Sequence, residues 1–342
     1  MLVVTALGGG ALLRRGDSVI TEGVRQNVRA AAAAFAAVAA DCQLVICQGE
    51  GPQPGLLALQ AAMFVQAETC PADVLRAHID DTLGCLLERE IASLLPAERD
   101  VARISATIEV DPADPAFAAP SMPTGPVYLR EEAERLTTRM HWTLRREGDK
   151  WRRVVASVQP SHVLELRPLQ MLLERNTVVI ATGGPGLPAV RAGTTARRLT
   201  GVECLVDRDL SAELLARELG ADMFVLLTDV DAVYLDWGKP TQRAIRRASS
   251  EAIATMPLQA GSMKPKVAAA CRFARATRRP AAIGRVPDLV RICRGEAGTT
   301  ISATEADLTW APEPGPLPIA MPLMKRRSSA GQSTGAHDGS GS

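Results

Sequence analysis

Two short polar segments in the second half of the chain carry residue types that could do chemistry. The first, Asp207-Arg208-Asp209, places a cation between two carboxylates at the expected start of a helix. The second is an apolar run from Phe224 that ends abruptly in Thr228-Asp229-Val230-Asp231. Because parallel α/β sheets bind ligands beyond the carboxyl ends of their strands, a nucleotide is expected beside this second segment. Together the two segments indicate phosphoryl transfer.

A third segment, Gly261-Ser262-Met263-Lys264-Pro265-Lys266, places two lysines around a proline just before an expected helix. Only five of the 39 basic residues are lysines, so the pair is conspicuous. A lysine at a helix start can neutralise the charge of a transferring phosphoryl group, whereas an exposed cap is the plain alternative. Asp207 and Asp209 could orient such cations or hold Mg²⁺, although aspartates at a helix start are also ordinary caps. Asp229 and Asp231 could likewise simply solvate a strand end.

Glycine clusters follow three expected strands, at Gly8–Gly10, Gly49–Gly55 and Gly183–Gly186. Glycine lets backbone N–H groups approach phosphate oxygens without interference from a Cβ atom, and a following helix N-terminus adds a favourable dipole. None of the clusters matches a P-loop or a dinucleotide-binding motif. Tight strand–helix turns would explain each cluster singly, whereas three clusters in one sheet favour phosphate binding.

Alternating strands and helices must position these segments. Apolar strands are predicted at 2–7, 43–47, 177–182, 223–228 and 299–302, and period-two alternation predicts another over 104–110. Helices are predicted over about 21–40, 71–94, 164–175, 209–219 and 266–276. Strands that alternate with helices predict an α/β fold whose mostly parallel sheet is covered on both faces.

The segment 111–153 breaks this alternation because it is rich in proline and charge. We interpret it as a protruding subdomain or lid within one domain that spans 1–311. From Pro312 the composition turns to Pro, Gly and Ser with a basic run at Lys325-Arg326-Arg327, so 312–342 is expected to be a disordered tail.

Composition excludes several classes of partner and site. The net charge of +1 makes nucleic acid a poor candidate as a partner, and no apolar run is long enough for a transmembrane helix. The seven cysteines form no C-x-x-C pair, and the four histidines add no metal-ligand cluster. Structural zinc and a disulfide framework are therefore not expected, and a reducing cytoplasm fits the chain.

Residues 1–302 resemble carbamate kinase, a family of the amino-acid kinase superfamily. Nine blocks carry the resemblance in order: ALGGGALLRRG (6–16), QGEGPQPGLLALQ (48–60), DPADPAF…PTGPVY (111–128), RRVVASVQP (152–160), VIATGGPGLP (179–188), GVECLVDRDLSAELLARELGAD (201–222), LLTDVDAVYLDWGKPTQ (226–242), AGSMKPKVAAACRF (260–273) and GTTIS (298–302). The resemblance implies a three-layer αβα sandwich with a protruding subdomain, homodimerisation and Mg-ATP as the phosphate partner. It also implies the reversible reaction of carbamoyl phosphate and ADP with carbamate and ATP.

The resemblance also implies roles for individual residues. The catalytic set would be Lys266, Arg208, Asp207 and Asp209. The carbamoyl and phosphoryl groups would be held by Gly8, Gly9, Gly10, Gly49, Glu50 and Gly51. The nucleotide would be held by Gly183, Gly184, Thr228, Asp229, Asp231, Ala232, Tyr234 and Met263. The ATP phosphates would carry Mg²⁺, so no protein ligand is assigned to the metal.

The chain departs from the family pattern at chemical positions, which makes it a divergent member. Where the family pattern reads ALGGNAL, this chain has Gly10 instead of Asn, and where it reads HGNGPQVG, this chain has Gln48 and Glu50 instead of His and Asn. Met122 stands in place of the lysine of PTKPIG, and Arg208 in place of the lysine of DKD. A roomier and more acidic pocket suits an acceptor with an amine or guanidino group better than bare carbamate. For Arg208, which keeps the charge on a longer, planar group, drift without a change of role remains an alternative.

Two functions remain open from the sequence. One is a carbamate kinase-like phosphotransferase, acting on carbamate or on a larger, amine-bearing carbamate or carboxylate. The other is a non-catalytic homologue that binds nucleotide or carbamoyl phosphate as a partner subunit. Well-kept nucleotide segments beside altered acceptor residues fit either a new substrate or lost catalysis.

Overall fold

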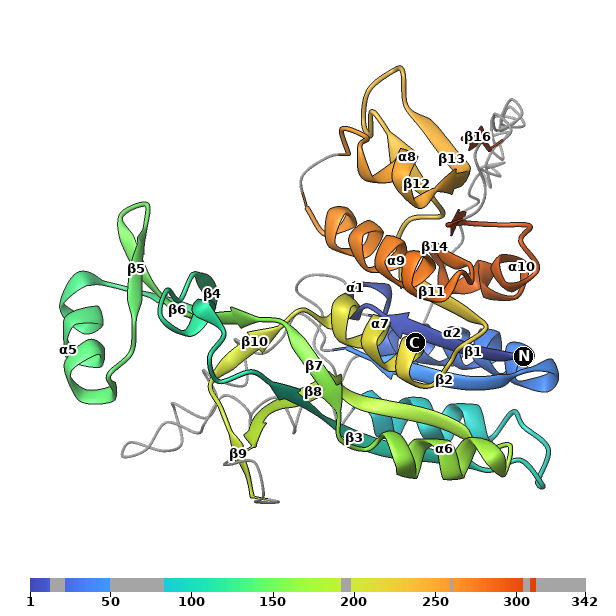
Figure 1. The fold of residues 1–342 in the computed structure, drawn as a ribbon, viewed down its shortest axis with the longest axis horizontal. Helices are drawn as coiled ribbons and strands as arrows, with labels where there is room; N and C mark the ends of the chain where they lie inside the picture. The colour runs from blue at the N-terminus through green and yellow to red at the C-terminus, as the bar shows by residue number, and fades with distance from the viewer. Residues whose placement is uncertain (13–21, 50–82, 192–197, 259–260, 304–307, 312–342) are drawn as a thin grey trace, which may run out of the picture. The chain divides into compact units, whose positions relative to one another are not determined.

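The computed structural model describes residues 1–12, 22–49, 83–191, 198–258, 261–303 and 308–311 (Figure 1). The predicted tail at 312–342 lies outside the described residues, as do Glu50 and Gly51 of the second glycine cluster. The predicted helix over 71–94 is described only from residue 83, and residues 83–92 are helical.

One large sheet contains twelve of the described strands, with the main order β12-β13-β15-β14-β11-β1-β2-β8-β3-β7. β16 pairs with β13, and β9 pairs with β8. The strands are β1 (Leu2–Leu7), β2 (Gln43–Gln48), β3 (Val101–Val110), β7 (Pro160–Val163), β8 (Val178–Arg191), β9 (Leu199–Gly201), β11 (Met223–Thr228), β12 (Val233–Leu235), β13 (Arg243–Ser249), β14 (Ala281–Arg285), β15 (Thr299–Ser302) and β16 (Thr309–Trp310).

The centre of this sheet is parallel. The neighbours β14, β11, β1, β2, β8 and β3 all run in one direction, and antiparallel pairs lie toward the edges. Every residue of β11 is buried, as expected of a strand that is covered on both faces. This arrangement confirms the predicted α/β fold with a mostly parallel sheet.

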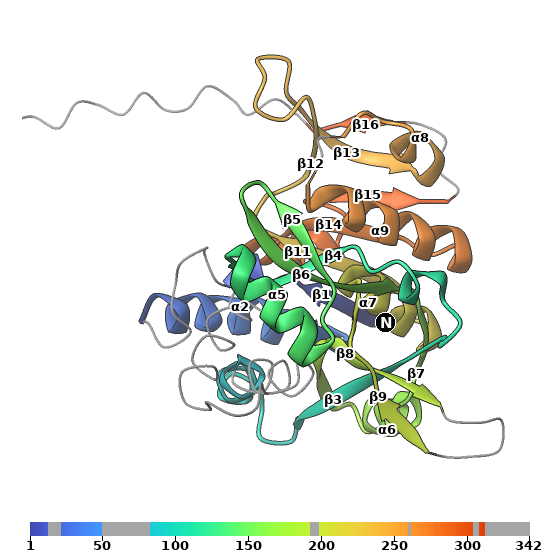
Figure 2. The same cartoon turned by 90° about the vertical axis from the view of Figure 1, so that its left-hand side faces the viewer.

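Helices cover both faces of the sheet. The labelled helices are α1 (Gly9–Leu12), α2 (Glu22–Asp41), α5 (Arg130–Met140), α6 (Leu166–Glu174), α7 (Arg208–Glu218), α8 (Ser250–Ala254), α9 (Met263–Thr277) and α10 (Leu289–Cys293), with short 3₁₀ turns at Pro115–Phe117 and Val286–Asp288. Among them, α5 lies beside the smaller sheet rather than on the large one (Figure 1). One apolar core joins α6, α7 and α9 to the sheet, and a second joins α2, residues 83–92 and α10 to its other face. Figure 2 shows α2 on one side of β1 and α7 and α9 on the other.

A smaller sheet of four strands has the order β10-β6-β4, with β5 paired to β6. Its strands are β4 (Met122–Tyr128), β5 (Leu144–Glu147), β6 (Lys150–Val158) and β10 (Cys204–Val206), and α5 lies between β4 and β5 in the chain. Most of this sheet comes from the proline-rich segment that interrupts the alternation. The limits 111–153 of a subdomain remain a prediction.

Three features differ from the sequence-based expectations. β8 does not stop at Thr182 but continues to Arg191, with Gly183–Gly186 opposite Ala106 alone, so these four residues bulge from a longer strand. α9 begins at Met263 rather than Lys266, since Pro265 lies in the first turn, where its missing N–H costs no hydrogen bond. β13 and β14 were not predicted, because their charged or Ala- and Gly-rich sequences show no apolar strand pattern.

Candidate functional site

The carboxyl ends of three adjacent strands bring the predicted residues together. β1 lies between β2 and β11, with Leu7 opposite both Gln48 and Leu227. Gly8 and Gly49 follow directly, and Thr228 ends β11. The N–H of Gly49 donates to Leu7 O over 3.1 Å, and the N–H of Gly8 to Leu227 O over 3.4 Å. The first two glycine clusters and the Thr-Asp segment therefore begin at one edge of the sheet.

Lys266 lies at this edge in an ion pair with Asp209. Its Nζ donates to Asp209 Oδ1 over 2.8 Å and to Oδ2 over 3.1 Å, and the lysine is 8% exposed. A Cβ atom built on Gly8 would lie 3.7 Å from Nζ, so the ammonium faces the end of β1. Lys264, two residues earlier, is exposed. The structure thus separates the two lysines of the GSMKPK segment, and Lys266 is the one at the site.

Asp207 caps α7. Its Oδ1 accepts the N–H of Leu210 over 2.9 Å, the usual bond of an aspartate N-cap. Of the two carboxylates around Arg208, one therefore fixes the start of the helix, and the other, Asp209, bonds Lys266. Asp207 is thus a helix cap, the plain alternative that the sequence left open. Its role in orienting a catalytic cation remains a proposal.

Arg208 lies against the second glycine cluster. A Cβ atom on Gly49 would come within 3.3 Å of Arg208 Cδ and 3.4 Å of its Nη1, and within 3.3 Å of Leu7 O. Glycine therefore makes room for both the arginine and the neighbouring strand end. The guanidinium is thereby placed beside the backbone from which the predicted acceptor contacts start.

The remaining predicted glycines occupy two kinds of backbone. Gly9 and Gly10 open the short helix α1, and Ala11 N–H donates to Gly8 O over 2.9 Å. Gly183 and Gly184 belong to the bulge in β8, next to Thr182. Thr182 pairs with Ser105 of β3, and β8 follows β2 in the sheet. Both sets thus lie near the carboxyl ends of parallel strands.

The predicted nucleotide segment is rich in short polar contacts. Thr228 Oγ1 donates to Asp229 Oδ1 over 3.1 Å, and the Tyr234 hydroxyl donates to Asp231 Oδ1 over 2.8 Å. Burial and then the bond to Asp231 raise the pKa of Tyr234 to about 12, so the hydroxyl stays a donor at neutral pH. The Tyr234 ring packs against Trp237 with centroids 4.9 Å apart. Ala232 is buried, and Met263 opens α9 with no side-chain cap bond at Ser262.

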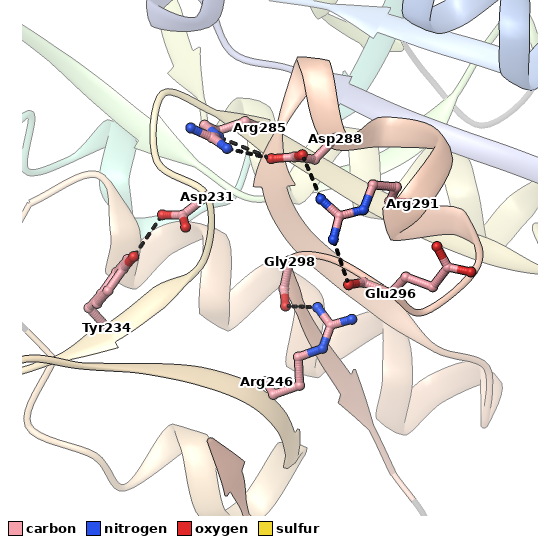
Figure 3. A network of polar contacts seen from close by, with 8 residues as sticks. All are labelled: Asp231, Tyr234, Arg246, Arg285, Asp288, Arg291, Glu296 and Gly298. Atoms are coloured by element: carbon pink, nitrogen blue, oxygen red, sulfur yellow. Dashed lines mark hydrogen bonds and ion pairs between the residues drawn. The ribbon is translucent and has the colours of Figure 1, made fainter. Parts of the chain in front are cut away.

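Arg285 is a further cation at this edge that the sequence analysis did not identify. It ends β14 directly opposite Thr228. Its Nε and Nη2 donate to Asp288 Oδ2 over 3.1 and 2.8 Å, and Asp288 Oδ1 lies 3.4 Å from Arg291 (Figure 3). The bond to Asp288, with smaller effects from Asp231 and Tyr234, raises the pKa of Arg285. The one available signal was a basic residue directly after the short run Ala281–Gly284.

Gln48 and Met122 are two further altered positions in the described part of the chain. Gln48 is fully buried at the end of β2, and its Oε1 has no hydrogen-bond partner in the part of the chain that the structure describes. A Cβ atom on Gly84 would lie 3.0 Å from that oxygen and 2.6 Å from Thr182 Cγ2, so a larger residue at 84 would require these side chains to move. Met122, in β4, is 42% exposed. Within the described residues, no three His, Cys, Asp or Glu side chains gather as a metal site.

Comparisons with known proteins identify the family. The model of the amino acid kinase family matches residues 1–285. A carbamate kinase of Rhizobium meliloti is 45% identical over 319 residues, covering 92% of this chain and 98% of the relative. One from Haemophilus influenzae is 46% identical, covering 91% and 99%. The solved carbamate kinase of Giardia lamblia bound to AMP-PNP has a TM-score of 0.80 and 30% identity, covering 88% of this chain and 98% of that one.

Proposed function

Because the chain belongs to the amino acid kinase family and, within it, to the carbamate kinases, we propose that Lys266, Arg208 and the two glycine turns form its phosphoryl-transfer site. The reaction is the reversible conversion of carbamoyl phosphate and ADP to carbamate and ATP. The observation that carries the assignment of the site is the buried Lys266–Asp209 pair, which faces Gly8 where β1, β2 and β11 end.

The charge of the transferring group is stabilised by Lys266 and Arg208. Phosphoryl transfer needs little covalent chemistry from the protein, so catalysis is mostly positioning and charge neutralisation. Lys266 supplies a compact ammonium whose direction Asp209 sets, and Arg208 supplies a planar guanidinium beside Gly49. No general base is required, because carbamate is already an anion. Asp207 contributes by fixing the start of the helix that carries both Arg208 and Asp209.

The backbone holds the carbamoyl and phosphoryl groups. The N–H groups of Gly9 and Gly10 open α1 directly after β1, where a helix start favours an oxyanion. The N–H groups of Gly8 and Gly49 bond the neighbouring strand ends, so these two glycines contribute room for the group through their missing Cβ atoms. Glu50 and Gly51 are proposed to continue this contact surface, although they lie outside the described residues. Gly183 and Gly184, in the bulge of β8, are proposed to contact the nucleotide instead.

The nucleotide is held on the β11 side. Thr228, Asp229, Asp231, Ala232 and Tyr234 follow the strand, and the start of α9 at Met263 presents backbone N–H groups that no side chain caps. A helix N-terminus of this kind favours phosphate. Mg²⁺ is expected to arrive on the ATP phosphates, as the family resemblance implies, and would neutralise charge there. Arg285 adds a cation beside these residues.

The acceptor is carbamate or a larger, amine-bearing relative of it. Three alterations favour the larger acceptor: Gly10 and Glu50 change the pocket, and Met122 removes a cation. We also propose a homodimer, from the family resemblance, and a reducing, cytoplasmic setting, because the six described cysteines are free. No described helix has the length and apolarity that a membrane crossing requires.

Purified protein tests the reaction through ATP formation from carbamoyl phosphate and ADP. The reverse direction is then measured with carbamate and with a panel of amino- and guanidino-bearing acids. We expect turnover in the carbamoyl phosphate assay, lost in Lys266→Met. Faster turnover of a panel member than of carbamate would establish the larger acceptor. Robust turnover of carbamate alone would refute the hypothesis of a larger acceptor. Nucleotide binding without any turnover would instead support a non-catalytic subunit.

A further inference from the structure

A second ion pair joins the two helices that carry the Lys266–Asp209 pair. Glu213 lies one turn after Asp209 on α7, and its side chain is fully buried. Its Oε2 lies 3.2 Å from Arg272 Nε, on α9, in an ion pair without hydrogen-bond geometry, and this oxygen accepts no hydrogen bond from the described residues. Its Oε1 accepts from Arg217 Nε over 3.0 Å within α7. The carboxylate therefore cross-links α7 to α9 and at the same time bonds its own helix.

The two cross-links follow the same direction along both helices. Asp209 and Lys266 lie near the N-termini of α7 and α9, and Glu213 and Arg272 lie further along each. The separation is four residues, or about 6 Å of rise, on α7 and six residues, or about 9 Å, on α9. The apolar core already packs α7 and α9 together, and a single ion pair restricts sliding and pivoting between them at one height only. Two pairs at different heights fix both motions.

The burial of Glu213 makes this contact costly in free energy, which favours a role in fixing geometry over a role in stability. Removing a carboxylate from water is unfavourable, and burial accordingly raises the pKa of Glu213 in spite of Arg217 and Arg272. A buried ion pair is therefore weak evidence for stability and better evidence for a defined geometry. Arg272 also reaches Gln159 Oε1 over 3.4 Å, which ties the pair to the segment between β6 and β7.

We propose that Glu213 and Arg272 are positioning residues that hold Lys266 at the reaction site through the register of α7 on α9. The inference rests on the proposed role of Lys266. Loss of the Glu213–Arg272 contact lets α9 shift against α7, and the ammonium then meets the transferring group off its optimum. Because transition-state contacts depend more steeply on placement than substrate contacts do, kcat suffers more than KM.

The test compares Glu213→Gln and Arg272→Gln with Arg217→Gln. The first two break the link between α7 and α9, and the third removes a partner of the same carboxylate that never leaves α7. We expect about a tenfold loss of kcat in the first two with KM within twofold for both substrates, and no loss in Arg217→Gln. Arg272 is 41% exposed, so Arg272→Gln is expected to fold even if Glu213→Gln does not.

Two further measurements separate positioning from general destabilisation. In an Asp209→Asn background, where the route from α7 to Lys266 is already broken, Glu213→Gln should cost nothing more in single-turnover assays. The proposal would be overturned if Glu213→Gln lowered the rate by the same factor in the wild-type and Asp209→Asn backgrounds. It would also be overturned if Arg217→Gln lowered kcat as much as Glu213→Gln does. Amide hydrogen exchange of residues 267–273 of α9, whose N–H groups are hydrogen-bonded within the helix, needs no turnover. The exchange rate should rise in Glu213→Gln and Arg272→Gln but not in Arg217→Gln. Unchanged exchange would contradict the proposed link between α7 and α9, whatever the enzyme's activity.

Discussion

Lys266 and Lys264 are two residues apart, yet their surroundings differ completely. Lys266 is 8% exposed and bonds both oxygens of Asp209, whereas Lys264 lies in solvent. An ammonium that is shielded from water and held by one carboxylate interacts more strongly with a phosphoryl group than an exposed one does. Arg285 and Arg291 are both exposed and differ in place instead: Arg285 ends β14 opposite Thr228, whereas Arg291 lies on α10 (Figure 3).

The first residue-scale prediction concerns the two lysines. Lys266→Met should lower kcat about 100- to 1,000-fold, the usual cost of one charge-stabilising group, while the dissociation constant of ADP changes little. Steady-state kinetics and calorimetric titration measure the two quantities. Lys264→Met removes the same charge from the same helical turn and should retain at least half of wild-type kcat. Comparable losses in both variants would place the catalytic charge elsewhere.

The second residue-scale prediction concerns Arg285. Arg285→Gln should raise KM for ADP about fivefold and leave KM for carbamoyl phosphate unchanged, since the arginine lies opposite Thr228 on the nucleotide side. Arg291→Gln is the matched control, because Arg291 shares Asp288 but reaches Glu296 O on the side away from Asp231. If KM for ADP stays at the wild-type value in Arg285→Gln, the arginine serves the α10 region alone.

At the scale of elements, the start of α7 carries three successive residues with three separate tasks. Asp207 caps the helix, Arg208 lies over Gly49, and Asp209 bonds Lys266. A helix places successive side chains about 100° apart, so neighbours in sequence reach different partners. The local pattern Asp-Arg-Asp is therefore one structural unit, and α7 transmits any change in its cap to the arginine and to the ion pair.

The prediction at this scale separates the capping of Asp207 from its charge. Asp207→Asn keeps a good cap and should keep both thermal stability and kcat, whereas Asp207→Ala should cost about 1 kcal/mol of stability and lower kcat as α7 frays. Urea denaturation and kinetics of the two variants provide the measurement. A large drop in kcat for Asp207→Asn at unchanged stability would show that the carboxylate charge itself takes part in catalysis.

At the scale of the whole molecule, buried and paired carboxylates shape the dependence of stability on pH. Burial raises the pKa of Glu213 above its ordinary 4.5, whereas the bond to Arg191 lowers the pKa of Glu109. A raised carboxyl pKa means that the folded state binds more protons than the unfolded state, so this contribution to stability falls as pH rises above 4.5. A lowered pKa has the opposite sign, and that contribution is lost as pH falls below 4.5.

Denaturation of variants from pH 3 to pH 8 tests these two signs. The free energy of unfolding of the wild type minus that of Glu213→Gln should decrease as pH rises above about 4.5. The same difference for Glu109→Gln should instead increase as pH rises toward 4.5 and stay level above it. Parallel slopes for the two substitutions would contradict the assigned environments of both carboxylates.

Features that depend on neighbouring residues can be recognised directly in the sequence. Apolar runs located β1, β2 and β11, the glycines after them marked the strand ends, and Asp207 was recognisable as a possible cap. The nine ordered blocks also indicated the family, which the relatives confirm. These features are local because chain periodicity, turn conformation and capping each act over a few residues.

Contacts between residues that are distant in the sequence are visible only in the folded structure. Asp209 rather than Asp207 bonds Lys266 across 57 positions, Arg285 lies opposite Thr228, and Glu213 reaches Arg272. These contacts depend on the order of strands in the sheet and on how α7 packs against α9, and neither leaves a periodic trace in the sequence. Long-range ion pairs follow from the geometry of packing, so the residue types at 207–209 suggested the chemistry and the fold assigned the partners.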